Sequence, residues 1–145
     1  MKKFLLGAVA AAGVAFSAAA EEAPKTLVTI LTAPEPQTQL MAMVLSMQAA
    51  QQGATPHILL CGPAADIALK DAPESATAGQ PPKNMSPQGL MTKIMTLPGA
   101  KVEVCAIYLP GKGADASILL DGVGVANPQA MAGAMIAPNA RIASY

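Results

Sequence analysis

The chain is poor in aromatic residues, with no Trp, two Phe and two Tyr among 145 residues. Proteins that bind nucleic-acid bases commonly stack them on aromatic rings, so we do not expect this mode of recognition. The hydrophobic share is nevertheless 52%. The core must therefore be built from Leu, Ile, Val, Ala and Met.

Charge is also scarce, with nine basic and nine acidic residues and no long run of either sign. Nothing here attracts nucleic acid, so no nucleic-acid partner is expected. Neither a GxGxxG nor a Walker A sequence occurs, and Gly111-Lys112-Gly113 lacks the other residues of a phosphate loop. We therefore expect no cofactor. The carboxylates Asp66, Asp71 and Glu74 are scattered, which indicates a solvated surface rather than a metal site.

Residues 1–20 have the pattern of a secretory signal peptide. A basic start at Lys2 and Lys3 precedes an apolar run and small residues before Glu21. The run is shorter than the ~20 apolar residues of a membrane span, and no later stretch qualifies. We expect cleavage, a periplasmic or otherwise secreted protein, and no membrane association afterwards. Residues 21–145 then form one domain with a net charge of −2.

Apolar runs and helical periodicity alternate along this domain. Residues 26–32 are β-branched and almost continuously apolar, which is typical of a strand buried on both faces of a parallel sheet. Further strands are predicted at 57–61, 102–107, 123–125 and 141–145, with helices at 37–52, 64–70, 89–97 and 116–120 and one after Asn127. The fold class is therefore α/β: a flavodoxin-like three-layer domain with about five mainly parallel strands and helices on both faces. Residues 71–86 are predicted to form an exposed loop, because they are rich in Pro, Gly and Ser.

The two cysteines follow the second and third predicted strands. A flavodoxin-like strand order, 2-1-3-4-5, would put Cys61 and Cys105 two strand spacings apart, about 9–10 Å. A disulfide needs its Cα atoms within about 7 Å, so two free thiols are favoured over an intrachain bridge. A bridge to another subunit or a partner is the third alternative.

Cys105 is the candidate catalytic residue, because it ends the third strand and would face the crevice where the strand order reverses. Thr32, Glu35, Cys61 and Lys112 are the candidate binding residues around it. A nearby cation would favour the thiolate and a carboxylate would oppose it. The alternative is that Cys105 is a small apolar residue of the core.

Methionine and histidine allow further alternatives. Three Met pairs stand four residues apart: Met43 and Met47, Met91 and Met95, Met131 and Met135. Thioethers and thiolates together select Cu(I), but amphipathic helices that pack on a sheet need apolar residues at the same spacing, so core packing is favoured. His57, the single histidine, begins its strand at the opposite edge from Cys105 and is predicted to be structural, which disfavours a Cys/His dyad.

The order of these elements resembles that of the DsrE/DsrF-like family over most of the mature chain. The matching segments are the strand 27–32, the helix that ends at Gly53, the strand 57–61, the stretch Gly99-Ala100-Lys101-Val102-Glu103-Val104-Cys105, Leu120-Asp121-Gly122-Val123, the helix after Asn127 and the closing residues 141–145. The long loop 71–86 and the export signal distinguish this chain from the basic pattern of the family.

The resemblance implies small flavodoxin-like subunits that assemble into homo-oligomers, as trimers or hexamers. In some members a cysteine at the position of Cys105 carries sulfur as a persulfide. The implied role is that of a sulfur carrier or thiol-redox protein with a thiol or sulfur-transfer protein as partner, and it leaves open whether the protein is an enzyme. A non-catalytic module that binds a small ligand or a protein is the second hypothesis, and copper binding is the third.

Overall fold

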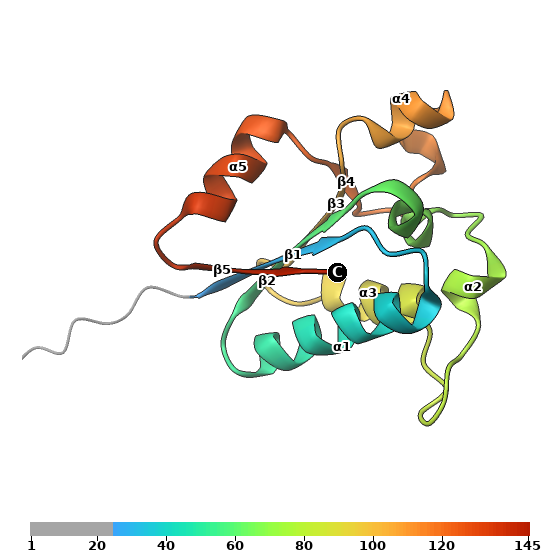
Figure 1. Cartoon of the computed structure of the whole chain (residues 1–145), viewed down its shortest axis with the longest axis horizontal. Helices are drawn as coiled ribbons and strands as arrows, with labels where there is room; N and C mark the ends of the chain where they lie inside the picture. The colour runs from blue at the N-terminus through green and yellow to red at the C-terminus, as the bar shows by residue number, and fades with distance from the viewer. Residues whose placement is uncertain (1–24) are drawn as a thin grey trace, which may run out of the picture.

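The computed structural model describes residues 25–145 as one five-stranded parallel sheet with helices on both faces (Figure 1). The strands are β1 (Thr26–Leu31), β2 (Thr55–Leu60), β3 (Lys101–Val104), β4 (Gly124–Val125) and β5 (Ala140–Ser144). The prediction of a three-layer α/β domain is confirmed. The predicted signal peptide, residues 1–20, lies outside the described residues.

The strand order is β4-β3-β2-β1-β5, so the predicted order 2-1-3-4-5 is wrong. Strands β1 to β4 follow one another across the sheet, and β5 pairs with the remaining side of β1. The apolar runs of β1 and β2 indicate interior positions for both strands, but they do not say which of the two lies beside β3. Here successive strands are neighbours, which is the commoner arrangement.

One face of the sheet is covered by α1 (Pro36–Gln51) and α3 (Pro87–Met95), which lie side by side (Figure 1). Both helices have Pro in the first turn, and the Ser86 side chain caps α3 by accepting a hydrogen bond from the Gly89 N–H at 3.1 Å. The larger fully buried side chains of this main core include Leu31, Met43, Ile58, Leu60, Met91, Ile94 and Val104. Most of the apolar burial therefore lies between the sheet and these two helices.

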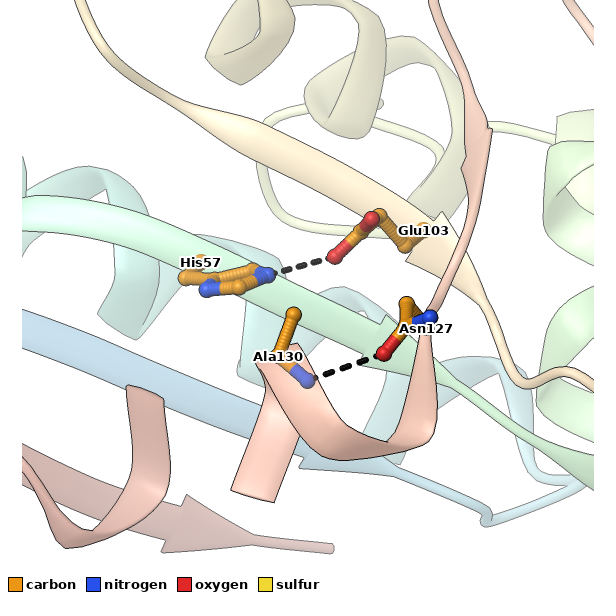
Figure 2. Close-up of polar contacts among 4 residues, drawn as sticks. All are labelled: His57, Glu103, Asn127 and Ala130. Carbon is orange, nitrogen blue, oxygen red and sulfur yellow. Dashed lines mark hydrogen bonds and ion pairs between the residues drawn. The ribbon is translucent and has the colours of Figure 1, made fainter. Parts of the chain in front are cut away.

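The opposite face is covered by α5 (Pro128–Ile136) (Figure 1). Asn127 caps this helix, as predicted, by accepting a hydrogen bond from the Ala130 N–H at 3.0 Å (Figure 2). Among the described residues, the buried members of this second cluster are Val28, Ala126 and Met131. This layer is therefore thinner than the first.

The connection from β2 to α3 is more ordered than the predicted loop. A 3-10 helix, η1 (Gly62–Ala68), takes the place of the helix predicted at 64–70, and α2 (Glu74–Thr77) interrupts the predicted exposed loop 71–86. Ala76 in α2 is fully buried. A single helical turn is too short to give an apolar period, so the sequence pattern did not reveal it.

The connection from β3 to β4 also differs from the prediction. The strand predicted at 102–107 already ends at Val104, and α4 (Tyr108–Lys112) follows it where no helix is predicted. A second 3-10 helix, η2 (Ala116–Ile118), replaces the longer helix predicted at 116–120. In residues 25–145 no helix combines the length and the apolarity needed to cross a membrane.

Candidate functional site

The two cysteines lie beside each other at the carboxyl edge of the sheet. The register of β2 and β3 pairs Leu60 with Val104, and Cys61 and Cys105 are the next residue on each strand. The Cys105 N–H donates to the Leu60 carbonyl oxygen at 2.9 Å, which continues the ladder to this point. The predicted gap of two strand spacings is therefore wrong, because β2 and β3 are adjacent.

Both cysteines point to the face of the sheet that α5 covers. Ile58 and Leu60 are buried in the main core, so the alternation along β2 sends Leu59 and Cys61 to the opposite face. Cys105 lines a groove of about 290 Å³ together with Leu59 and Met131. Both thiols are free and half-buried.

Gly62 turns the chain directly after Cys61. Its φ of +55° lies in the left-handed region, which glycine adopts without the strain that a side chain would bring. The turn leads into η1, which carries Asp66 back toward the strand ends. The same short connection therefore supplies a thiol and a carboxylate to one site.

The cysteine pocket is an open cavity of about 540 Å³ at the carboxyl ends of β2 and β3. Its lining residues are Cys61, Gly62, Pro63, Asp66, Cys105, Ile107, Tyr108, Gly111 and Lys112. Two connections that are far apart in the sequence, the one after β2 and the one after β3, thus form its walls.

One wall of the pocket is a polar triad of Asp66, Tyr108 and Lys112. The Tyr108 hydroxyl and the Lys112 ammonium both donate to Oδ1 of Asp66, at 2.6 and 2.9 Å. The Lys112 Nζ also lies 5.3 Å from the centre of the Tyr108 ring. A carboxylate, a phenol and an ammonium group therefore hold one another in place beside the thiols.

The pKa values of this triad follow from its contacts. Burial raises the pKa of Asp66, but the hydrogen bonds from Tyr108 and Lys112 outweigh it and leave the pKa below its ordinary value. Burial, followed by the hydrogen bond to Asp66, raises the pKa of Tyr108. At neutral pH Asp66 is ionised and Tyr108 remains a neutral donor.

The pKa of Cys61 is shifted by its surroundings. Burial, and next to it the neighbouring Cys105, raise the pKa of Cys61 to about 12. Two thiolates in contact would repel each other, so Cys61 retains its proton at neutral pH. At neutral pH the site therefore contains Cys61 as a protonated thiol next to Cys105.

The structure places three of the five predicted site residues together. Cys105, Cys61 and Lys112 line the cysteine pocket, whereas Thr32 and Glu35 are not among its lining residues. The Thr32 hydroxyl instead donates to the Tyr145 carbonyl oxygen at 2.9 Å, and Glu35 precedes the first turn of α1. The reason is the strand order, since the reversal falls between β1 and β5 and not beside Cys105.

Asp66 and Tyr108 are the residues that the sequence did not reveal. Asp66 was interpreted as a solvated surface carboxylate, but it accepts the two hydrogen bonds of the triad. The sequence did contain one signal, because Asp66 follows Cys61 and Tyr108 follows Cys105 within a few residues. The partners lie 42 and 46 residues from Asp66, too far for a local pattern to show.

The methionines divide between the core and the groove beside Cys105. Met43 of α1 and Met91 of α3 are fully buried, as core packing predicts. Met131 and Met135 of α5 line the groove with Cys105. No group of three or more His, Cys, Asp or Glu side chains within residues 25–145 is placed to hold a metal ion.

His57 contacts Glu103 and no cysteine. Its Nε2 lies 2.6 Å from the Glu103 carboxylate, across the β2–β3 pair on the side covered by α5 (Figure 2). Neither residue lines the cysteine pocket. The pair instead links β2 and β3 on the face that α5 covers.

Comparison with known proteins identifies the fold. No protein-family model matches the chain, nor does any curated protein. The crystal structure of the ychN protein from E. coli is similar, with a TM-score of 0.63 and 15% identity over 84% of this chain and 99% of that one. The protein of unknown function MTH1491 from Methanobacterium thermoautotrophicum gives a TM-score of 0.58 and 14% identity over the same shares. Both have the DsrE-like fold, and so does this chain.

Proposed function

We propose that the protein is a sulfur carrier or thiol-redox protein that acts through Cys105. The observation that carries the proposal is that two free thiols at the ends of adjacent strands line one open pocket, where a second chain or a small molecule can reach them. The DsrE-like fold supports it as well, because the family resemblance implies a persulfide at the position of Cys105.

The loading step takes sulfur from a persulfide donor, R–S–SH. The Cys105 thiolate attacks the terminal sulfur of the donor, a new S–S bond forms on Cys105, and the donor leaves as the thiolate R–S⁻. The number of S–S bonds is conserved, so no outside oxidant is needed. Cys105 is assigned as the acceptor because Cys61 keeps its proton at neutral pH.

Intact mass spectrometry tests this step. The purified protein is incubated with inorganic polysulfide, desalted and weighed with and without alkylation. The native protein and the Cys61→Ser variant should each gain ~32 Da per sulfur atom, and Cys105→Ser should gain nothing. A Cys105 that neither alkylates nor gains mass in the native protein would move the assignment to a non-catalytic binding module.

We also propose that the chain is exported and that it loses residues 1–20. The basic start, the apolar run and the small residues before Glu21 support this proposal. Expression of the full chain in a bacterium, followed by N-terminal sequencing of the periplasmic fraction, should give Glu21 as the first residue. An uncleaved chain in the cytoplasmic fraction would contradict it.

A homo-oligomer, trimer or hexamer, is the proposed assembly, and a thiol or sulfur-transfer protein is the proposed partner. Ile107 beside the pocket and Ile136 on α5 support an assembly, because they are 78% and 84% exposed. Sedimentation velocity should show a trimer or hexamer, with dissociation in Ile136→Lys. A native protein that sediments as a monomer at micromolar concentration would refute the assembly.

A further inference from the structure

The backbone already brings the two cysteines within reach of a disulfide. Adjacent strands lie about 4.8 Å apart, and disulfide Cα atoms are usually about 4.4–6.8 Å apart. Leu60 and Val104 are register partners. The hydrogen bond from the Cys105 N–H to the Leu60 carbonyl continues this register, so Cys61 and Cys105 lie next to each other. Both cysteines also line the same pocket.

The surroundings of the pair allow the small approach that a bond requires. Cys61 and Cys105 each follow the last residue of a strand, so neither lies within the regular part of the sheet. Gly62 comes next to Cys61, and a β-carbon built on it would meet nothing within 4 Å. Both thiols line an open pocket, from which a small leaving group can reach solvent.

We propose that Cys61 is a resolving thiol, which releases the sulfur held on Cys105 as sulfide and leaves a Cys61–Cys105 disulfide. This inference rests on the proposed loading of Cys105. The Cys61 thiolate attacks the Sγ of the Cys105 persulfide, the Sγ–S bond breaks, and the terminal sulfur departs as HS⁻. The sulfane sulfur gains two electrons, and the two cysteine sulfurs supply them by forming the disulfide.

An external dithiol completes the cycle. It reduces the Cys61–Cys105 disulfide by thiol–disulfide exchange and becomes a disulfide itself, so that both cysteines return to thiols. A monothiol acceptor can instead take the sulfur from Cys105 before Cys61 reacts. The sulfur on Cys105 is therefore either transferred to an acceptor or reduced to sulfide by Cys61.

The protonation of Cys61 sets the rate of sulfide release. Burial raises the pKa of Cys61 and leaves little thiolate at neutral pH, so the persulfide should survive there for transfer. The thiolate fraction rises about tenfold per pH unit below that pKa, and sulfide release should rise with it. The carrier therefore discharges itself slowly at neutral pH and faster under alkaline conditions.

A single-turnover experiment tests the resolving step. The purified native protein is loaded with inorganic polysulfide, desalted without oxygen or reductant, and followed at about pH 7, 8 and 9 by sulfide release and intact mass. We expect one sulfide per loaded chain, a rate that rises with pH, and a final mass ~2 Da below that of the dithiol form. Peptide mapping should locate the bridge at Cys61 and Cys105.

Cys61→Ser is the matched variant, because the hydroxyl has nearly the shape of the thiol but does not attack sulfur. With the release rate expressed per loaded chain, the variant should release sulfide at least tenfold more slowly than the native protein at pH 9. Equal rates in the two proteins, or a disulfide only between chains, would overturn the inference and leave the loading on Cys105 intact. Failure of both proteins to load would overturn the proposed function itself.

A second measurement separates chemistry from folding. Diamide, an oxidant of thiols, is applied to the unloaded native protein, which should form the intrachain disulfide, and urea unfolding of Cys61→Ser should show a folded protein. A native protein that diamide does not close into the Cys61–Cys105 bridge would refute the resolving role, whatever the stability of the variant.

Discussion

The two faces of the sheet differ in what they bury and in what they carry. The face under α1 and α3 holds fully buried side chains such as Leu60 and Val104, whereas the face under α5 buries a cluster of three residues in the described part of the chain. Cys105 and the His57–Glu103 pair lie on the second face, and the alternation along β2 directs Cys61 to the same side. Stability is concentrated on one side of this sheet and reactive side chains on the other.

This division follows from the alternation of side chains along β2 and β3. Val102 and Val104 are buried in the main core, while Lys101 and Glu103 occupy the intervening positions. A layer that covers its face completely would bury those charges at a large cost. The partial cover by α5 leaves them, and the thiols beyond them, within reach of water.

The largest expected effect comes from shortening one methionine on each face. Met91→Ala should lower the free energy of unfolding by about 2–4 kcal/mol, because Met91 is fully buried and the cavity cannot collapse. Met131→Ala, in the thin layer, should cost less, about 2 kcal/mol, because fewer buried side chains surround it. Urea unfolding of both variants checks the difference, and equal losses would show that the two layers contribute alike.

A buried hydrogen bond under α1 gives the next effect. The Ser46 hydroxyl donates to the Ala42 carbonyl oxygen at 2.8 Å and lies 2.9 Å from the Thr29 hydroxyl. Ser46→Ala leaves the Thr29 hydroxyl without this partner and should cost about 1–2 kcal/mol in urea unfolding. Thr29→Val keeps the shape and the Ala42 bond, so it should cost less than about 0.5 kcal/mol. A larger loss in Thr29→Val would contradict this account.

The smallest effect belongs to Asp66 in the cysteine pocket. Its pKa is lower in the folded state, so its contribution to stability is complete above its ordinary value near 3.8 and is lost as the pH falls through the folded value. Because the Asp66 side chain is 34% exposed, the contribution should stay below about 1 kcal/mol.

Urea midpoints of the native protein and Asp66→Asn between about pH 6 and pH 2.5 measure this contribution. The difference between the two proteins should shrink with falling pH. Lys112→Met should lose part of the same dependence, because it removes one of the two donors to Asp66. A difference that stays constant over this range would assign the acid sensitivity to other carboxylates.

Local sequence signals predicted the elements better than their arrangement. The strand predicted at 26–32 and the helix predicted after Asn127 depend on residues a few positions apart, and the structure confirms both. The helix predicted at 37–52 also forms, but Met41 and Leu45 of its apolar set are 50% and 45% exposed. Whether β1 or β2 lies beside β3 depends on packing across the whole sheet. No local pattern shows this, so the predicted strand order is wrong. The short α2 and α4 left no period to detect.

The candidate site was predicted in part for the same reason. Cys105 and Lys112 stand in one connection and Cys61 in another, and their position at strand ends was visible in the sequence. The error in strand order brought Thr32 and Glu35 to the site and placed Cys61 at a distance. The bonds of Asp66 to Tyr108 and Lys112 depend on that same order, because they join the connections of two adjacent strands.

The pairing of β5 with β1 also affects when the fold can form during synthesis. The first strand of the sheet receives one of its two neighbours from residues 140–144, and the Thr32 N–H donates to the Tyr145 carbonyl oxygen at 2.9 Å. On a ribosome, β1 would emerge long before this neighbour, with one edge unpaired. Completion of the sheet therefore waits for residues 140–144, which are translated after the other four strands.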